Sequence, residues 1–345
     1  MKAFAQDSYG SADVMQSRDL DRPQIAADQV LVRVRAAGVN PADWAIMEGL
    51  PYIARPVYGL RRPKAGTRGT DVAGIVEAIG SGVTRFKPGD EVFGSADGSY
   101  AEFAAAAEDQ LVPKPANLTF EQAAAVPMAG QVALLALRGV EAGQKVLING
   151  ASGGIGSFAV QISKAYGAEV TAVVSTRNAD MVRALGADHV IDYTKEDFTR
   201  GGARYDLLLD NVSNHSLSDL RRALAPSGIL IPNGGRFDKR WMASGGRVIA
   251  AMVMSRFLSQ TLRTFVMSTR LETLLELKEL IEAGKVTPVI DRTYPLSHTA
   301  QALAYVGEGH ARGKTVITVG TPVTDAKPGP AGTPIAAAAS IVVAS

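Results

Sequence analysis

The sequence predicts an α/β protein in which a β-rich N-terminal region precedes an open sheet of parallel strands. Two observations lead to this fold class. Up to Thr119, short β-branched runs alternate with glycine and proline turns, which is typical of strands. Beyond Thr119, apolar runs alternate with segments of helical spacing, as in successive β-α-β units. The length of 345 residues favours two domains, because one core usually serves about 100–200 residues.

The N-terminal region, taken as residues 1–124, contains several short predicted strands. They are separated by glycines and by turns such as Lys87-Pro88-Gly89-Asp90. The strands are expected at residues 30–35, 74–80, 91–93 and 100–107. A small, irregular β-domain is therefore expected here.

The second region, residues 125–265, follows a predicted helix start at Thr119. Gln122 lies three residues further on, so the two side chains are expected to form a capping box. Helices are expected at residues 128–138, 157–166, 179–185 and 217–224. Strands are expected at 145–149, 169–174, 189–192, 206–209 and 229–231.

The remaining chain is less regular. Residues 241–265 mix methionine and arginine at helical spacing, which favours a helix packed on the core; a wall of the substrate cleft or a subunit contact is the alternative. A helix at 271–283, a strand at 286–294, a helix from Ser297 and a strand at 315–319 are expected next. Residues 321–345, rich in proline and alanine, are predicted to be a disordered tail.

The composition narrows the classes of function. The net charge is +2 and the basic residues are scattered, so neither nucleic acid nor an acidic membrane is an expected partner. No apolar run is long enough to span a membrane, and the N-terminus lacks the apolar region of a signal peptide, which predicts a cytoplasmic protein. The absence of cysteine excludes disulfides, cysteine nucleophiles and thiolate metal sites.

A glycine-rich loop carries the strongest functional signal. Ala151-Ser152-Gly153-Gly154-Ile155-Gly156 stands between a predicted strand and a predicted helix, the arrangement that binds the pyrophosphate of a dinucleotide. Gly153 is expected to let the backbone approach the phosphates, and Gly156 to let the helix lie close to the strand. Ser152, Gly153, Gly154, Ile155 and Gly156 are thus candidate cofactor residues.

The end of the next strand indicates which dinucleotide binds. Proteins that bind NAD place an acidic residue about 20 residues after the loop, on the ribose hydroxyl. Here the chain reads Val174-Ser175-Thr176-Arg177, without an acid. Ser175 and Arg177 are suited to a 2′-phosphate, which predicts NADPH; a solvated arginine at a helix start is the alternative.

Several motifs together resemble the quinone oxidoreductase (zeta-crystallin-like) branch of the medium-chain dehydrogenase/reductase superfamily. They are Asn149–Gly156, Ala159–Lys164, Leu185–Tyr193, Gly38–Asp43, Gly69–Gly74, Lys87–Val92 and Ala123–Gly130. The resemblance covers residues 1–320. It implies a GroES-like catalytic domain and a Rossmann domain, with residues 266–320 returning to the first domain. Relatives are usually dimers, so a homodimer is expected.

The resemblance and the expected sheet edge suggest further site residues. Asn40 and Tyr52 match cleft positions of the family and are candidates for donating hydrogen bonds to the substrate oxygen; a turn-capping Asn and a packed Tyr are the alternatives. Val132 replaces the usual threonine near the nicotinamide. The other candidates for cofactor contacts follow strands or match a basic family position: Tyr193, Asn211, Val212, Asn233, Gly234 and Lys314.

The absence of metal ligands sets the expected chemistry. Zinc-dependent relatives need cysteines and carry Gly-His-Glu where this chain has Gly69-Thr70-Asp71. A metal-free reductase of quinones or α,β-unsaturated carbonyls is predicted, because these acceptors spread the charge of the added hydride. The alternatives are a zinc-independent NAD(P)-dependent alcohol or aldehyde dehydrogenase and a dinucleotide-binding sensor or RNA-binding protein with little turnover. The basic loop from Pro51 to Thr67 is read as solvated, with a lid for anionic substrates as its alternative.

Overall fold

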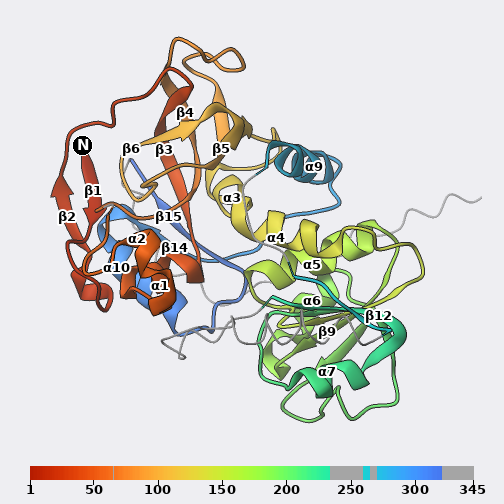
Figure 1. The fold of residues 1–345 in the computed structure, drawn as a ribbon. Helices are drawn as coiled ribbons and strands as arrows, with labels where there is room; N and C mark the ends of the chain where they lie inside the picture. Colours follow the sequence, from red (N-terminus) through yellow and green to blue (C-terminus); the bar gives the residue numbers. More distant parts are fainter. Residues whose placement is uncertain (65, 234–258, 265–269, 321–345) are drawn as a thin grey trace, which may run out of the picture.

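The computed structural model describes residues 1–64, 66–233, 259–264 and 270–320, which form two domains side by side (Figure 1). The first domain contains β1 (Lys2–Ala5), η1 (Ala12–Val14), β2 (Gln16–Asp19), β3 (Gln29–Val39), α1 (Pro41–Glu48), η2 (Tyr52–Ala54), α2 (Arg55–Tyr58), β4 (Asp71–Ile79), β5 (Glu91–Ser95), β6 (Phe103–Ala107), η3 (Glu108–Gln110), β7 (Leu111–Pro113) and α3 (Phe120–Ala124).

The second domain begins with a long buried helix. It contains α4 (Pro127–Leu137), β8 (Lys145–Asn149), α5 (Gly154–Ala165), β9 (Glu169–Val174), η4 (Thr176–Asn178), α6 (Ala179–Ala184), β10 (His189–Asp192), β11 (Tyr205–Asp210), α7 (Leu217–Arg222), β12 (Leu224–Pro232) and β13 (Thr261–Leu262). The remaining described elements are α9 (Leu271–Glu282), β14 (Ile290–Pro295), η5 (Leu296–His298), α10 (Thr299–Gly307) and β15 (Lys314–Thr318).

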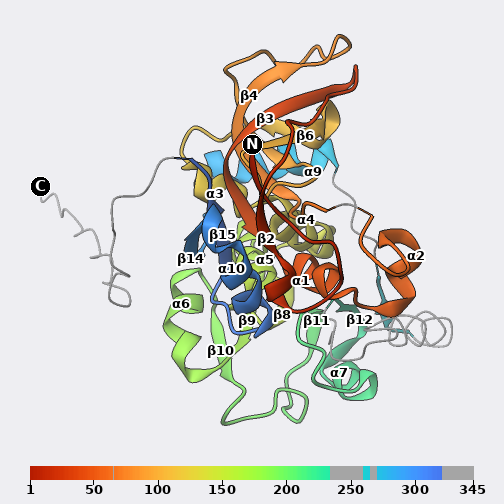
Figure 2. The ribbon, with the colours of Figure 1, turned by 90° about the vertical axis from the view of Figure 1, so that its left-hand side faces the viewer.

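The sheet of the first domain is completed by β15, the last strand among the described residues. Its order is β14-β15-β3-β4-β5-β7, with β6 also paired to β3. β15 runs antiparallel to β3, so that Thr315 lies opposite Val39. Figure 2 shows β14 and β15, in blue, beside the red and orange strands of the N-terminal domain. The register places Lys314 directly before the position opposite Val39, which matters for the site below.

The second sheet is parallel throughout its six described strands. Its order is β10-β9-β8-β11-β12-β13, and the direction of strand order reverses between β8 and β11. Ligands of open α/β sheets bind at the carboxyl ends of the strands beside such a reversal. The glycine loop follows β8, and Asn211 follows β11, so both lie at that edge.

Buried polar contacts link the second domain to the returning segment. Gln161, on the inner face of α5, donates its Nε2 to the carbonyl of Thr287 at 3.0 Å and accepts the Thr287 N–H at 2.8 Å. Its exposed fraction is 8%, so these bonds replace water. They hold the chain that leads into β14 against the helix of the glycine loop.

Most predicted elements are present, with shifted ends. The capping box is confirmed, since Thr119 Oγ1 accepts the N–H of Gln122 and Gln122 Oε1 accepts that of Thr119. The helix expected at 157–166 begins already at Gly154, because the glycine loop forms its first turn. The strand expected from residue 286 begins at Ile290.

Part of the predicted helix at 241–265 is wrong. Thr261 and Leu262 form β13 and pair with β12, because the edge of the parallel sheet accepts another strand there. Residues 241–258 and 265, as well as the predicted tail at 321–345, lie outside the described residues.

Candidate nucleotide and reaction site

The glycine loop turns directly from β8 into α5. Gly150 has a φ of +78°, and Gly153 caps the helix with extended backbone. A Cβ at Gly156 would lie 2.2 Å from the carbonyl oxygen of Gly150, so only glycine lets the helix lie this close to the strand. A Cβ at Gly153 would meet no protein atom nearer than 3.5 Å. Gly153 therefore leaves a cradle above the helix start, which is where a phosphate binds.

Asn178 connects the glycine loop to the end of β9, and the sequence did not single it out. Its Nδ2 donates to Ser152 Oγ at 2.9 Å and lies 3.4 Å from Ser175 Oγ. Its Oδ1 is buried and has no protein partner. A buried acceptor without a partner is unusual and is expected to face a ligand or a water. Asn178 thus holds two of the predicted cofactor residues in one place.

Arg177 and Tyr193 lie at the rim of this region. Arg177 is exposed on η4 and donates to the carbonyl of His310 at 3.4 Å. Tyr193 follows β10 and has an exposed fraction of 57%. Both side chains are accessible to a bound molecule. Ile155 is half-buried and packs against the core, so only its backbone is available to phosphate.

An acidic residue also lies near Arg177, at the end of the strand beside β9. Asp192, the last residue of β10, accepts hydrogen bonds from the hydroxyls of Thr176 and Thr194. These hydrogen bonds, first the one from Thr176 and then the one from Thr194, hold the pKa of Asp192 well below its usual value. Parallel pairing of β10 with β9 brings this carboxylate to the end of β9. Its oxygens are thus already engaged by neighbouring side chains.

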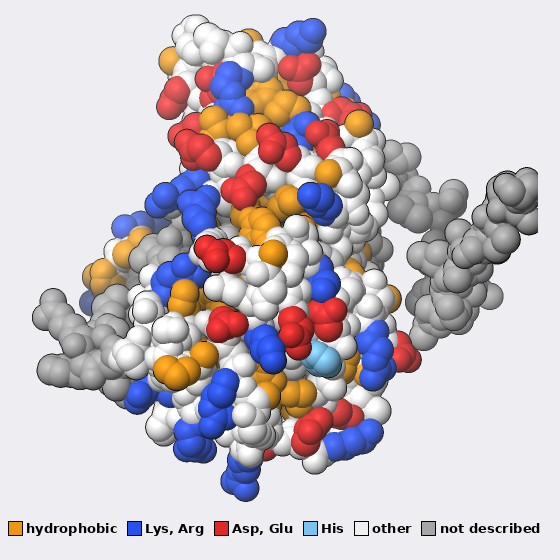
Figure 3. Space-filling view, turned by 90° about the vertical axis from the view of Figure 1, so that its right-hand side faces the viewer, with side chains coloured by type: hydrophobic (Ala, Val, Ile, Leu, Met, Phe, Trp, Pro, Cys, Tyr) orange, Lys and Arg blue, Asp and Glu red, His pale blue; other side chains and the backbone are white. Residues whose placement is uncertain are grey.

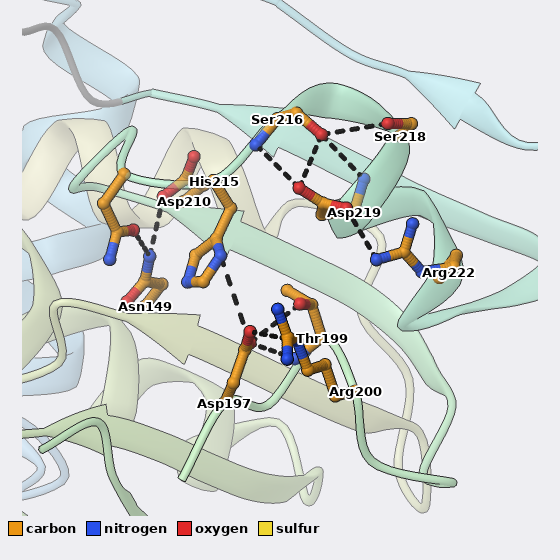
Figure 4. Close-up of polar contacts among 11 residues, drawn as sticks. Asn149, Asp197, Thr199, Arg200, Asp210, His215, Ser216, Ser218, Asp219 and Arg222 are labelled. Carbon is orange, nitrogen blue, oxygen red and sulfur yellow. Dashed lines mark hydrogen bonds and ion pairs between the residues drawn. The ribbon is translucent and has the colours of Figure 1, made fainter. Parts of the chain in front are cut away.

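The loop after β11 is held by the buried carboxylate of Asp210 (Figure 4). Asp210 Oδ1 accepts from Asn149 Nδ2 at 2.9 Å and from the backbone of Val212 and Ser213. Val212 is 40% exposed at this edge. The network joins the ends of β8 and β11, the two strands beside the reversal of strand order.

Asn211 has an amide nitrogen suited to a ligand. Its Oδ1 accepts from Asn233 Nδ2 at 2.8 Å, whereas its own Nδ2 is buried with no protein partner. The structure thus brings Asn211 and Asn233 together at the ends of the paired strands β11 and β12. Gly234 lies outside the described residues.

Figure 4 also shows His215 facing Asp197 and Ser216 facing Asp219. His215 Nδ1 lies 4.0 Å from Asp197, but Ser216 Oγ donates to Asp219 at 2.6 Å. A nucleophilic serine needs a base that takes its proton, whereas Ser216 is the N-cap of α7 and donates its hydroxyl proton to Asp219 in the first turn of that helix. The hydrogen bonds of Ser216 are those of a helix cap.

A buried cluster around Lys314 joins the two domains. Lys314 is 3% exposed; its Nζ donates to Asn40 Oδ1 and lies 3.4 Å from Asp71 Oδ2. Asn40 Nδ2 donates to the same Asp71 oxygen at 3.0 Å. The stem of Lys314 passes the glycine loop, since a Cβ at Gly154 would lie 3.0 Å from Lys314 Cδ. Lys314 is therefore within reach of both domains.

Two further members of this cluster are acidic or phenolic. Asp43 accepts from the Asn40 N–H and from the Tyr100 hydroxyl, both at 2.9 Å. Burial, followed by the nearby Asp71, raises the pKa of Asp43 to about 6. Burial also raises the pKa of Asp71, against the opposing effect of Lys314. One cation thus faces two buried carboxyl groups, which favours retention of a proton on Asp43.

Asn40 and Tyr52, the two residues predicted to contact the substrate, lie in different environments: Asn40 is buried in the cluster around Lys314, and Tyr52 packs against Arg55. Asn40 is only 2% exposed and its amide is engaged by Lys314 and Asp71. Tyr52 lies on η2, where the Arg55 guanidinium stacks over its ring at 4.4 Å. Val132 is buried on α4. The sequence missed Asp71 and Tyr100 as members of the Asn40 cluster, because their proximity depends on long-range folding of the sheet. It also missed Asp43, although the spacing of Asn40 and Asp43 at the start of α1 is that of a helix capping box.

Arg312 is another residue that the motifs did not mark. Its Nε is buried without a protein partner, and the next residue, Gly313, pairs with Gly153 of the glycine loop. Together with Asn178 and Asn211, it provides unpaired polar atoms around the cradle. These residues fit a dinucleotide, which offers phosphate and amide groups to match them.

Within the described part of the chain, no cluster of three or more His, Cys, Asp or Glu residues suited to a metal ion occurs. Nor does any helix within those residues have the length and apolar character needed to cross a membrane.

The chain is similar to known oxidoreductases over most of its length. Residues 26–116 match the alcohol dehydrogenase GroES-like domain, and residues 185–317 match a family described as zinc-binding dehydrogenase. A mitochondrial NAD(P)H oxidoreductase, RTN4IP1 of Bos taurus, is 35% identical, covering 92% of this chain and 89% of the relative. The chloroplastic NADPH-dependent alkenal/one oxidoreductase of Arabidopsis thaliana is 34% identical, covering 92% and 79%. The structure of the quinone oxidoreductase from Coxiella burnetii superposes with a TM-score of 0.81 at 29% identity, covering 92% and 99%.

Exchanging either of two loop glycines for alanine is expected to separate stability from nucleotide binding. Gly156→Ala should lower the free energy of unfolding by about 1–3 kcal/mol, because its Cβ would overlap the strand end. Gly153→Ala should cost less than about 1 kcal/mol but raise the Kd for NADPH at least about tenfold, because the Cβ fills the cradle. Urea unfolding and fluorescence titration measure the two effects. Equal nucleotide affinity in Gly153→Ala and wild type would contradict this assignment.

The Asp43 carboxyl is expected to make stability depend on pH. Because its pKa is raised from 3.8 to about 6, its stabilising contribution is complete below pH 3.8 and is lost as pH rises through about 6. Asp43→Asn does not titrate, so wild type should lose on the order of 2–3 kcal/mol relative to this variant across that window. Urea midpoints at a series of pH values measure the difference. Asp180→Asn, at an exposed position, is the control; parallel profiles for wild type and Asp43→Asn would refute the prediction.

Proposed function

The chain belongs to the medium-chain dehydrogenase/reductase superfamily, and on that premise we propose that it is an NADPH-dependent, metal-free reductase of quinones or α,β-unsaturated carbonyls. The observation that carries the proposal is the glycine cradle next to the buried Lys314. The names of the relatives, which include an alkenal/one oxidoreductase and a quinone oxidoreductase, support the same acceptor class.

The cofactor would be held along the carboxyl edge of the parallel sheet. We propose that the backbone of residues 152–156 holds the pyrophosphate, while Ser175, Arg177 and Tyr193 surround the 2′-phosphate. Asn211, Val212 and Asn233 would line the nicotinamide end, with Asn211 Nδ2 as a donor. Bound NADPH supplies a hydride to a conjugated carbon of the acceptor. Asn178 would position Ser152 and Ser175.

Lys314 would supply a positive charge beside the bound nucleotide, and Asn40 and Asp71 would hold that charge in position. We propose that the Lys314 ammonium group, 3% exposed, provides a fixed positive charge beside the glycine loop. Asn40 and Asp71 hold that charge in place, so Asn40 would act through Lys314 as a positioning residue. That Tyr52 contacts the substrate stays a prediction. Because the sequence contains no cysteine and has Thr70 in place of the histidine of zinc-dependent relatives, no metal ligand set is proposed.

A panel of acceptors tests the proposed function. With NADPH, a benzoquinone and a simple enone should each be reduced at least about a hundredfold faster, in kcat/KM, than a saturated aldehyde, because the latter needs a polarising group. Stopped-flow oxidation of NADPH measures these rates. Preferential turnover of the aldehyde or its alcohol would favour the zinc-independent alcohol dehydrogenase. Tight NADPH binding without turnover of any acceptor would favour the dinucleotide sensor.

Arg177 is expected to determine the preference for NADPH over NADH. A preference of at least about tenfold in kcat/KM is predicted for wild type, and Arg177→Ala should remove most of it, because a charge-assisted bond to the 2′-phosphate contributes about 1.5–3 kcal/mol. Arg183→Ala, on the exposed face of α6, is the matched control. Equal use of NADH and NADPH by wild type, or an unchanged preference in Arg177→Ala, would contradict the assignment.

Two wider expectations stay predictions. The relatives include proteins named as mitochondrial and chloroplastic, so their names do not support a cytoplasmic location for this chain. Sedimentation of the purified protein would test the predicted homodimer. Whatever the location and the oligomeric state of the protein, the expected partner is a small carbonyl or quinone substrate rather than nucleic acid.

A further inference from the structure

A short segment between α1 and β4 exposes an unusual number of apolar side chains. Seven large apolar residues are exposed in the described part of the chain, and four of them lie in this one loop. These are Ile53, Val57, Tyr58 and Leu60, with exposed fractions of 64%, 66%, 38% and 69%. Side chains of this kind normally pack inside, and clusters that do not pack mark interaction sites. We call residues 51–64 the 51–64 surface.

The same segment is strongly basic. Arg55, Arg61, Arg62 and Lys64 fall within it and Arg68 follows, whereas residues 51–68 contain no Asp or Glu. The whole chain has a net charge of only +2, so the local excess of positive charge is distinctive. Arg61, Arg62 and Lys64 are exposed beside the apolar side chains. The surface therefore combines apolar contact with positive charge.

Specific contacts hold the 51–64 surface in shape. The half-buried Arg55 stacks on the rings of Tyr9, at 4.7 Å, and Tyr52, and donates to the Gly49 carbonyl at 2.9 Å. Tyr9 also donates its hydroxyl to the carbonyl of Gly59 at 2.7 Å. Gly59 has a φ of +124°, a turn that disfavours any other residue. Polar contacts thus lie beneath the loop while apolar side chains point outward, the reverse of an ordinary surface loop.

We propose that the 51–64 surface docks on an anionic membrane surface. Positive side chains beside exposed aliphatic and aromatic ones suit a bilayer interface, where the cations meet lipid phosphates and the apolar groups enter the boundary of the acyl chains. In Figure 2, α2 projects at the right of the molecule. Figure 3 views the molecule from the opposite side, so the same edge is at the left, where blue and orange side chains lie together.

Charge argues against the other occupants. A symmetric contact with a second copy would place the exposed cations Arg61, Arg62 and Lys64 against their own copies, since a two-fold interface pairs a patch with itself. An acidic protein would match the charge but would leave the four protruding apolar side chains unexplained unless it also offered an apolar pocket. A bilayer interface accepts both kinds of side chain over one small area.

Vesicle flotation with the full chain tests the proposal. Phosphatidylcholine vesicles with and without phosphatidylglycerol are compared, at salt concentrations from about 0.05 M to 0.5 M. Val57→Ser with Leu60→Ser removes apolar contact, and Arg61→Gln with Arg62→Gln removes charge. The matched controls are Leu275→Ser, which is exposed on α9, and Arg183→Gln with Arg200→Gln, which are exposed elsewhere. Retained NADPH binding shows that each variant is folded.

Wild type should bind only the anionic vesicles, more weakly at high salt, and each pair of changes in the 51–64 surface should weaken binding about tenfold or more. The control variants should bind as wild type does. Absence of binding, equal binding to neutral vesicles, or binding unaffected by Val57→Ser with Leu60→Ser would overturn the proposal. Conversion of a dimer to a monomer by the apolar pair, measured by sedimentation without lipid, would instead assign the surface to a second copy.

Discussion

The buried ion pair between Lys314 and Asp71 is the interaction on which the cluster around Asn40 depends. Both side chains are buried, and the free energy cost of leaving either charge without its partner is about 3–5 kcal/mol. Asp71 also accepts the N–H of Met128, at the start of α4. One carboxylate therefore holds β4, β15 and α4 together, although these segments are far apart in the sequence. The packing around it leaves no room at Gly38, where a Cβ would lie 2.9 Å from Asp71 Cβ.

The returning strand has two effects at once. β15 completes the sheet of the first domain through its pairing with β3, and the residue before it, Gly313, pairs with Gly153 in the loop of the second domain. Lys314 therefore reaches the buried cluster and lies beside the nucleotide cradle. A nucleotide on the loop and an acceptor beside the first domain would be positioned by the same short stretch of chain. The same short stretch of chain thus contacts both the glycine loop of the second domain and the buried cluster of the first.

Much of the fold could be predicted from local patterns. The strand, loop and helix around Gly153 and Gly156 were recognised because glycine spacing and apolar periodicity are properties of consecutive residues. The clusters were harder to predict. Asn178 matches no motif, yet it bridges two predicted residues, and Asp192 reaches the end of β9 only because β10 lies parallel to that strand. Asn40 was expected in the cleft, but β-pairing and the return of β15 surround it with Lys314 and Asp71.

The sequence alone determined the dinucleotide loop, the alternation of strands and helices, and the absence of thiolate ligands, since each depends on residue type and short spacing. Only the tertiary structure decided which side chains are neighbours. Strands that are distant in the sequence bring Lys314 and Asp71 into contact. Burial in the folded protein raises the pKa of Asp43. The fold also leaves some buried polar atoms, such as Asn211 Nδ2, without a protein partner. Burial and pairing are properties of the whole fold, because solvent exclusion and charge separation depend on every segment that surrounds a group.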